Sequence, residues 1–483
     1  MKKVTAIALT VAMLTGMAGC NAKKEASEKG GVPVLKMYMC GNQQNDLAAV
    51  MEEANKIIEP AIGAKLDLIF IDMGAYTEKM NMKLATKEEF DICWTSGWAN
   101  PYDKGVQNES YYPLTKLIEE NAPELFDAVP EFWFDAARRD GEIYAVPNQQ
   151  VIGGLAALTL DRKWAEKYNL DVDSVKTIDD IEPFLQKIKD NEPDYFPTRP
   201  YYNYWEKNYE GITSCVGLDE REKGKLKAIY EWDAEGYEEG LEKLRQWYLK
   251  GYFREDVASV VDDNNDFLAG KYVVTGTGWK PGFEATQNAL LGGDNIVIKL
   301  DERSYAQGSS MIGTMLAVSA SSKHPDKAIK LISMLNTNKE LYNLLSYGIE
   351  GKHYNWVDDN HIKLVEDGGY YVNASWAFGN QFNAYLLEGQ EDDIWEETKK
   401  LNDNVEVSRI ISFVFDNSKV QTELSQIATV TQEYKNFANG SIDWKENIDQ
   451  YKAKMKAAGI ENVLNEVQRQ LDEYAKQSIK IGN

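Results

Sequence analysis

The stretch that decides the fold alternates predicted strands with predicted helices. Three short apolar runs have the length of buried strands: VLKMYM at residues 34–39, LDLIFI at 66–71 and FDICW at 90–94. Between the first two, residues 46–59 carry apolar side chains at helical spacing, and Pro60 is expected to end that helix. Residues 76–84 predict a second helix. Strands that alternate with helices in this way predict a parallel, doubly wound α/β sheet.

Two loops of this predicted sheet are the natural place for a ligand. In open α/β sheets, ligands bind beyond the carboxyl ends of the strands, where the strand order reverses. That rule selects Gly41-Asn42-Gln43 after the first strand and Thr95-Ser96-Gly97-Trp98 after the third.

The rest of the chain continues the alternation. We expect a helix at residues 236–251, a strand at 271–275 that ends before Gly276-Thr277-Gly278-Trp279, and a buried strand at 311–318. Pro325 opens a helix from the first-turn position that proline tolerates, and its apolar positions run to Leu345. A last helix carries a stripe of apolar side chains: Leu464, Val467, Leu471 and Tyr474.

The first residues have the pattern of an export signal. Lys2 and Lys3 precede an apolar or small stretch at residues 4–19, which is shorter than the roughly 20 residues that a transmembrane helix needs. The stretch ends on Ala18-Gly19-Cys20, which resembles a bacterial lipoprotein signal in which Cys20 is lipidated; Met17 departs from the Leu that is more usual there. The alternative is a soluble secreted protein with a chance cysteine.

Composition excludes several classes of partner. The net charge of −24 disfavours nucleic acid and anionic lipid surfaces. Beyond Cys20 the chain has only Cys40, Cys93 and Cys215, and an odd number in an exported chain argues against a disulfide framework. Cys93 lies in an apolar run, so we expect a buried thiol.

Several segments together resemble one family. DGEIYAVP (140–147), EGYEEGLEKLRQWYLKGYF (235–253), FLAGKY (267–272) and HPDKAIKLISML (324–335) resemble bacterial extracellular solute-binding proteins. GIEGKHY (348–354) and residues 413–474 resemble a lipoprotein subgroup of that family. The family serves ABC importers and often handles sugars or oligosaccharides.

The resemblance implies a periplasmic-binding-protein-like fold: two α/β lobes around a cleft, each with a doubly wound sheet, and a helical C-terminal extension. The expected division is a signal peptide at 1–19, a lipidated cysteine and flexible tether at 20–31, lobe 1 at 32–148 and 308–350, lobe 2 at 149–307, and the remainder of lobe 2 with the C-terminal helices at 351–483. The implied partners are an oligosaccharide and ABC permease subunits. The chain is expected to be a monomer, held on the extracytoplasmic face of the cell membrane by its lipid alone, with no cofactor.

Tryptophan and amide side chains near strand ends are the candidate ligand contacts. A flat indole can cover the apolar face of a sugar, while amides and carboxylates bind its hydroxyls. The candidates are Asn42, Gln43, Trp94, Trp98, Asn148, Gln149, Trp205, Trp279 and Trp376. Glu350 and His353, in GIEGKHY, either hold a turn or touch the ligand.

Two other readings of the sequence stay open, an exported carbohydrate-active enzyme of the glycosidase type and a receptor for a peptide or another polar solute. No local signature recommends an enzyme. The chain has three histidines, none in a HExxH arrangement, and no GxSxG elbow. The Asp262-Asn264-Asp266 run has Phe267 where a calcium loop needs glycine. We therefore expect no catalytic residues and no metal site.

Overall fold

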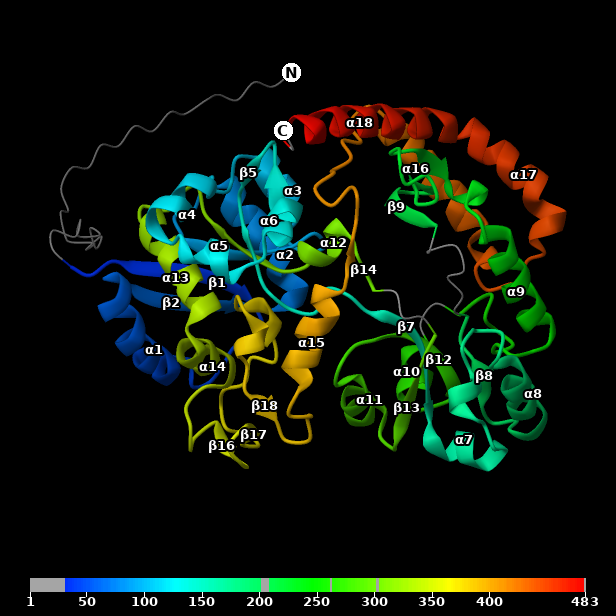
Figure 1. Cartoon of the computed structure of the whole chain (residues 1–483), viewed down its shortest axis with the longest axis horizontal. Helices are drawn as coiled ribbons and strands as arrows, with labels where there is room; N and C mark the ends of the chain where they lie inside the picture. Colours follow the sequence, from blue (N-terminus) through cyan, green and yellow to red (C-terminus); the bar gives the residue numbers. More distant parts are fainter. Residues whose placement is uncertain (1–30, 201–207, 261–262, 301–303, 482–483) are drawn as a thin grey trace, which may run out of the picture.

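The computed structural model describes residues 31–200, 208–260, 263–300 and 304–481. Figure 1 shows two α/β lobes side by side, with a helical C-terminal unit lying along one edge of the molecule. Each of these three parts has its own buried core. Lobe 1 is built from residues between 35 and 152 and between 306 and 384. Lobe 2 has its core at 158–188 and 244–298, and the C-terminal unit at 216–241 and 410–471.

The sheet of lobe 1 has the strand order β2-β1-β3-β15-β6. Its strands are β1 (Val34–Cys40), β2 (Lys65–Ile71), β3 (Ile92–Thr95), β15 (Met315–Val318) and β6 (Val146–Pro147). β1 pairs in parallel with both β2 and β3, which confirms the three predicted strands and their parallel arrangement. β15 runs antiparallel to β3 and β6. The carboxyl ends of β1 and β3 therefore lie at the same edge of the sheet as the start of β15.

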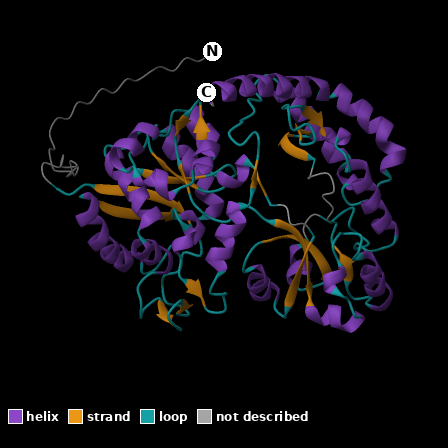
Figure 2. Ribbon diagram, viewed as in Figure 1, coloured by secondary structure: helices purple, strands orange, loops and turns teal. Residues whose placement is uncertain are grey.

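Helices surround this sheet (Figure 2). They are α1 (Leu47–Ile62), α2 (Met73–Ala85), α3 (Tyr102–Gln107), α4 (Thr115–Asn121), α5 (Glu124–Ala128), α6 (Glu131–Ala137), α12 (Gly308–Met311), α13 (Pro325–Thr337) and α14 (Lys339–Tyr347). Two predicted boundaries are wrong. Pro60 lies inside α1, which ends at a left-handed Gly63, so the glycine rather than the proline stops the helix. The helix that Pro325 opens breaks at Asn338, whose side chain accepts a hydrogen bond from Leu341 N and caps α14.

Lobe 2 contains a mixed sheet of order β13-β7-β12-β8. Its elements are β7 (Leu155–Asp161), β8 (Phe196–Thr198), β12 (Tyr272–Trp279), β13 (Asn295–Lys299), α7 (Arg162–Tyr168), α8 (Glu182–Asn191), α9 (Tyr237–Leu249), α10 (Asn264–Leu268) and α11 (Phe283–Leu291). The predicted strand end at Thr275 is wrong, because β12 stays paired with β7 as far as Trp279. Gly276 and Gly278 are thus part of a strand and not of a loop.

The C-terminal unit joins a small sheet, β11-β10-β9, to three helices. The elements are β9 (Tyr209–Thr213), β10 (Val216–Asp219), β11 (Ala228–Tyr230), α16 (Gln421–Glu433), α17 (Trp444–Ala457) and α18 (Ile460–Ile481). Val467 and Leu471 are fully buried, and Leu464 and Tyr474 pack against the same core, which confirms the predicted stripe. In Figure 1, α18 runs along the top of the molecule with its C-terminal end directed toward lobe 1.

Three segments connect the lobes. Residues 148–154 lead from β6 into β7, residues 304–308 contain β14 (Tyr305–Ala306), and residues 404–408 contain β19 (Glu406–Val407), which pairs in parallel with β14. Asn402, in α15 (Ile394–Asp403), binds the first segment through Ile152 N at 3.1 Å and Gln150 O at 2.8 Å. We call these three connections the hinge segments.

One expected boundary needs correction. The sequence assigned residues 351–483 to lobe 2 and the C-terminal helices, but buried side chains between Tyr354 and Ala384 pack into the core of lobe 1. This region contains β16 (Tyr354–Trp356), β17 (His361–Leu364) and β18 (Leu386–Leu387), which lie below lobe 1 in Figure 1. The physical reason is that Tyr370, Val372 and Phe378 find their apolar neighbours there.

The remaining elements are short: β4 (Arg138–Arg139), β5 (Glu142–Ile143), and the 3-10 turns Val172–Ser174, Glu231–Asp233, Ser375–Ala377, Gln381–Asn383 and Lys435–Phe437. Within the described residues, no helix combines the length and the apolar character needed to cross a membrane.

Candidate functional site

Three of the predicted ligand residues converge on one threonine that sequence reasoning missed. Thr314 lies directly before β15, and its hydroxyl accepts hydrogen bonds from Trp94 Nε1 and from Asn148 Nδ2, both at 2.8 Å. The same hydroxyl donates to Trp376 O at 3.4 Å. We call Trp94, Trp98, Gly313, Thr314 and Trp376 the tryptophan wall. The wall closes the edge of lobe 1 where β3 ends and β15 begins.

Trp98 is the exposed member of the tryptophan wall. Its side chain is 60% exposed, while its indole Nε1 donates to Gly313 O at 2.9 Å. The ring packs edge-on against Trp94, with centroids 5.4 Å apart. The neighbouring Gly97 lies close to Ile312, since a Cβ there would be 3.2 Å from the Ile312 side chain. The structure therefore presents an anchored indole on a rigid base, with more than half of its surface free.

The tryptophan wall rests on a buried base, which consists of Trp94 and of Asn148, the partner of Thr314. Trp94 is completely buried and contacts Trp376 on another side, with centroids 5.9 Å apart. Asn148 is also fully buried, and its amide binds Thr314, Ala377 O and Gly379 N. In this conformation neither side chain is open to a ligand. Trp376 is half-buried.

Gln149 points away from the wall. Its side chain is buried and lies 3.5 Å from Asn336 Oδ1, and its backbone exchanges hydrogen bonds with Gly379 and Gln381. The expectation that Gln149 faces a ligand is not met, since the chain here pairs with the segment around Asn380 instead of entering a loop.

Asn42 and Gln43 are exposed at the carboxyl end of β1, as predicted. Gln43 Nε2 donates to Phe70 O, which ties this residue to β2. Gln44 Nε2 donates to Asn42 O at 2.9 Å, and Gln44 Oε1 accepts from Tyr371 N at 2.7 Å. The side chains of Gln43 and Gln44 thus hold this loop to β2 and to Tyr371. Among the described residues, the Asn42 side chain has no hydrogen-bond partner.

Lobe 2 contributes Trp279 at the end of β12, opposite Leu155 in the register with β7. Leu155 directly follows the first hinge segment, so Trp279 lies where lobe 2 meets the hinge. The Lys299 ammonium lies 3.4 Å from the centroid of the Trp279 ring and covers one of its faces, and the indole Nε1 donates to Glu284 Oε1 at 3.3 Å. The neighbouring Lys280 is exposed, yet desolvation lowers its pKa, as expected for an ammonium in a concave surrounding. Trp205 lies outside the described residues.

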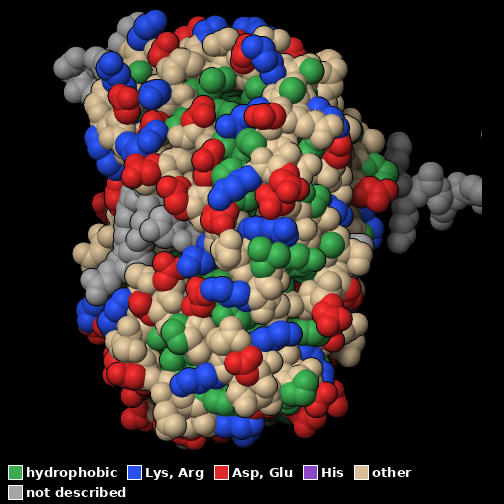
Figure 3. Space-filling model, turned by 90° about the vertical axis from the view of Figure 1, so that its right-hand side faces the viewer, with side chains coloured by type: hydrophobic (Ala, Val, Ile, Leu, Met, Phe, Trp, Pro, Cys, Tyr) green, Lys and Arg blue, Asp and Glu red, His purple; other side chains and the backbone are tan. Residues whose placement is uncertain are grey.

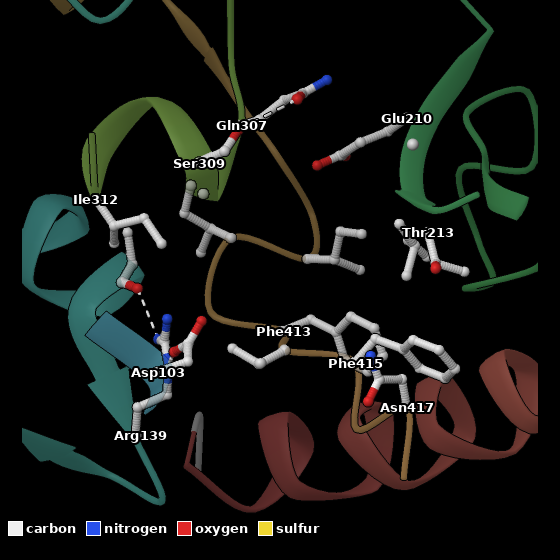
Figure 4. Close-up of a pocket in the computed structure, with 17 residues that line it drawn as sticks. Asp103, Arg139, Glu210, Thr213, Gln307, Ser309, Ile312, Phe413, Phe415 and Asn417 are labelled. Carbon is white, nitrogen blue, oxygen red and sulfur yellow. Dashed lines mark hydrogen bonds and ion pairs between the residues drawn. The ribbon is translucent and has the colours of Figure 1, made fainter. Parts of the chain in front are cut away.

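A separate cavity of about 310 Å³ lies between lobe 1 and the C-terminal unit, and it contains none of the nine predicted residues. Figure 4 shows Asp103, Arg139 and Ile312 on the lobe 1 side, facing Thr213 and Phe413 across the opening. We call this the inter-core cavity. Its basic group is already engaged, because Arg139 Nε donates to Asp103 Oδ1 at 2.5 Å.

The carboxylate of the inter-core cavity is engaged as well. Glu210 is buried, and it accepts hydrogen bonds from Tyr305 OH at 2.7 Å and from Ser408 Oγ at 2.7 Å. Burial raises the pKa of Glu210. Tyr305 and Ser408 belong to the two hinge segments that contain β14 and β19. Glu210 therefore ties the C-terminal unit to the hinge, and no local motif in the sequence signals this role.

The thiols and the other titratable groups offer little chemistry. Cys40 and Cys93 are buried, which confirms the prediction for Cys93, and burial raises the pKa of each of these thiols and of Cys215 to about 12. In the part of the chain that the structure describes, no group of three or more His, Cys, Asp or Glu side chains is placed to hold a metal ion.

Comparison with known proteins decides the family. The sequence model for bacterial extracellular solute-binding proteins matches residues 44–342, well over half of the chain. The chain belongs to this family. A second model, for a domain of unknown function (DUF3502), matches residues 409–476, which begin directly after the last hinge segment and include most of the helices of the C-terminal unit. The two-lobed fold of this solute-binding protein is the one that the sequence resemblance implied.

Two curated relatives extend along most of the chain. A carbohydrate ABC transporter substrate-binding protein of Streptococcus pneumoniae is 29% identical and covers 98% of both chains. Lipoprotein LipO of Bacillus subtilis is 20% identical over 83% of this chain and 84% of its own.

Solved structures agree with this assignment. The crystal structure of the N-glycan transport solute-binding protein NgtS from Streptococcus pneumoniae matches with a TM-score of 0.81 at 26% identity, covering 92% of this chain and 100% of that one. Two further structures of NgtS, in complex with Man1GlcNAc and with Man5GlcNAc, are 27% identical and match with TM-scores of 0.67 and 0.66. They cover 92% of this chain, and 100% and 99% of their own. The same relative thus fits the described conformation less well in its glycan complexes.

Proposed function

We propose that this solute-binding protein captures an oligosaccharide between its two lobes and delivers it to the permease of an ABC importer. Trp98 supplies the principal stacking surface on lobe 1, with Trp376 and Asn42 beside it. Trp279 faces the ligand from lobe 2. The protein releases its ligand unchanged and is not an enzyme.

The observation that carries this proposal is the state of Trp98. A large apolar ring that is 60% exposed has a free energy cost in water, which a ligand relieves when it covers the ring. The indole N–H is already bonded to Gly313 O, so the ring is oriented before the ligand arrives. A flat, pre-oriented aromatic surface matches the C–H face of a pyranose better than it matches a charged or extended peptide.

The inter-core cavity is the weaker candidate for the oligosaccharide. Its volume of about 310 Å³ is at the lower limit for ligand pockets, which hold about 300–1,000 Å³. Its Arg139 and Glu210 side chains have partners within the protein, so a sugar hydroxyl would have to displace them.

The relatives suggest the class of sugar. NgtS was crystallised with Man1GlcNAc and Man5GlcNAc, and it is similar to this chain over 92% of its length. We therefore propose mannose- and N-acetylglucosamine-containing oligosaccharides as the first ligands to test. The better match to the first NgtS structure supports the idea that the described conformation is the open one and that the lobes close on the ligand.

The proposed lobes follow the three cores. Lobe 1 comprises residues 32–148 and 308–384, lobe 2 the core segments between 155 and 300, and the C-terminal unit moves with lobe 2. Helix α9 supports this grouping, because its Leu241 packs in the core of the C-terminal unit while its Leu244 and Trp247 pack in the core of lobe 2.

We further propose that the chain is a lipoprotein held at the extracytoplasmic face of the cell membrane by Cys20, as a monomer. Residues 1–30 lie outside the described part, so this rests on the sequence. Cys20→Ala should release the protein from membranes or leave it unprocessed. Fractionation that found the variant both processed and membrane-bound would contradict the lipid anchor.

Thermal shift with ligand recovery tests the receptor function. A ligand that binds only the folded protein stabilises it by about 2.7 kcal/mol at a hundredfold excess over Kd. Man1GlcNAc or Man5GlcNAc should raise the melting temperature of the soluble protein, and mass spectrometry should recover each sugar intact. Shortened sugars would instead favour a glycosidase, and a shift with peptides alone would favour a peptide receptor.

A further inference from the structure

A buried histidine stands behind the Asn42–Gln43 loop. His353 is 1% exposed, so it cannot touch a ligand in the cleft. Its Nδ1 accepts a hydrogen bond from Ile349 N at 2.8 Å, which requires that the proton of the neutral ring be on Nε2. Nε2 lies 3.2 Å from Asp46 Oδ2 and therefore donates to that carboxylate.

Asp46 is the residue through which His353 reaches the loop. It directly precedes α1, where an aspartate side chain usually caps the helix, yet it makes no cap hydrogen bond. The carboxylate turns instead to His353 and to Lys352, whose Nζ lies 2.7 Å away. Asp46 N donates to Gly369 O at 3.1 Å, so the end of the loop is fixed by its backbone as well. The Lys352 ammonium and then the His353 ring lower the pKa of Asp46.

Two glycines leave room for this arrangement. A Cβ on Gly348 would lie 2.2 Å from His353 Nδ1, and a Cβ on Gly369 would lie 2.8 Å from Asp46 Oδ2. Both glycines also have a positive φ, of 83° and 88°. The GIEGKHY segment thus forms a turn that is shaped around the imidazole, which resolves the alternative that the sequence left open for His353.

We propose that His353 is a positioning residue: its Nε2–H holds Asp46, and thereby fixes residues 41–45 in the geometry in which Asn42 and Gln43 meet the sugar. This rests on the proposed function. The loop of residues 41–45 follows β1, and the turn that contains His353 follows α14. The hydrogen bond from His353 to Asp46 therefore joins two parts of lobe 1 that are distant in the chain.

Two substitutions separate this role from a merely structural one. In His353→Gln, the amide nitrogen can occupy the place of Nε2 and donate to Asp46, but the bond from Ile349 N is lost. In His353→Asn, the amide oxygen can occupy the place of Nδ1 and accept from Ile349 N, but the donor to Asp46 is lost. The proposal predicts that His353→Gln keeps the affinity for Man1GlcNAc at a cost in melting temperature. It predicts that His353→Asn, at a similar cost in melting temperature, weakens binding about tenfold, so that the two variants differ in affinity and not in stability.

Hydrogen–deuterium exchange gives a readout that needs no ligand. The amides of residues 41–46 should exchange faster in His353→Asn than in the wild type, while His353→Gln should protect them. Asp46→Ala removes the acceptor from the other side of the bond and should resemble His353→Asn. Unchanged exchange of this loop in His353→Asn and Asp46→Ala would overturn the inference.

The inference and the proposed function fail in different ways. If Asn42→Ala and Gln43→Ala leave the affinity for Man1GlcNAc unchanged while His353→Asn loosens the loop, the loop is positioned but is not a ligand loop. If those two variants weaken binding and His353→Asn does not, the ligand loop is right and His353 has no positioning role.

Discussion

The tryptophan wall and the inter-core cavity both lie beside the hinge segments, but they differ in which side-chain groups are left without a partner. At the wall, the polar groups of the base are paired, and the most exposed surface is an apolar indole, Trp98. In the cavity, Arg139 is paired with Asp103, and Glu210 accepts hydrogen bonds from Tyr305 and Ser408. This difference is why we propose the sugar site at the wall, where an exposed, oriented indole stands on a paired and buried base, and not in the empty volume of the cavity.

The largest expected effect is the loss of stability when Trp94, the buried support of the tryptophan wall, is replaced. Trp94 is fully buried and contacts Tyr76, Trp98 and Trp376. Trp94→Ala should lower the free energy of unfolding by about 3–5 kcal/mol, because it opens a cavity under the wall. Trp94→Phe is the matched control, since it keeps a ring there and should lose less. Denaturant melts of both variants measure this. An alanine variant as stable as the wild type would mean that Trp94 does not support the wall.

A smaller effect is expected at Thr314. Thr314→Val keeps the shape of the side chain but leaves Trp94 Nε1 without its acceptor in a buried site. This should cost about 1–3 kcal/mol of unfolding free energy, whereas Thr314→Ser, which keeps the hydroxyl, should cost less. Equal stability of the valine and serine variants would show that the hydroxyl does not hold the wall together.

The smallest of the stability effects is a pH dependence in the cavity. The pKa of Glu210 is raised by burial above its usual value of 4.5. A carboxyl group with a higher pKa in the folded protein stabilises the fold below the unfolded pKa, and this contribution is lost as pH rises through the folded pKa. The wild type should therefore lose stability relative to Glu210→Gln from about pH 4.5 upward. Urea melts between pH 4 and 7 test this, and parallel stability curves for the two proteins would contradict it.

The sequence predicted the strands of lobe 1 and the exposure of Trp98, Asn42 and Gln43, because these follow from local apolar patterns and from the rule for strand ends. It left open whether Trp94, at the end of the same strand, is buried or exposed, because the burial of Trp94 depends on partners that are remote in the chain, among them Thr314, more than two hundred residues away. The placement of residues 354–384 on lobe 1 was missed for the same reason. It depends on apolar contacts with a core that is built from distant strands.

The role of His353 and the clamp at Glu210 were also beyond the sequence. Both are single polar residues whose partners are remote in the chain, Asp46 for one and Tyr305 with Ser408 for the other. Turn geometry gave a partial signal at His353, since GIEGKHY contains Gly348, where a Cβ would collide with the buried ring. No comparable local signal marks Glu210.

Calorimetric titration of Trp98→Ala with the oligosaccharide that stabilises the wild type tests the central claim most directly. Removing a ring that covers a sugar face should cost about 1–3 kcal/mol of binding free energy, which corresponds to roughly a tenfold to hundredfold rise in Kd. The melting temperature without ligand should change little, because Trp98 is 60% exposed. Unchanged affinity together with a sharply lower melting temperature would show that Trp98 serves the fold, and that the sugar binds elsewhere.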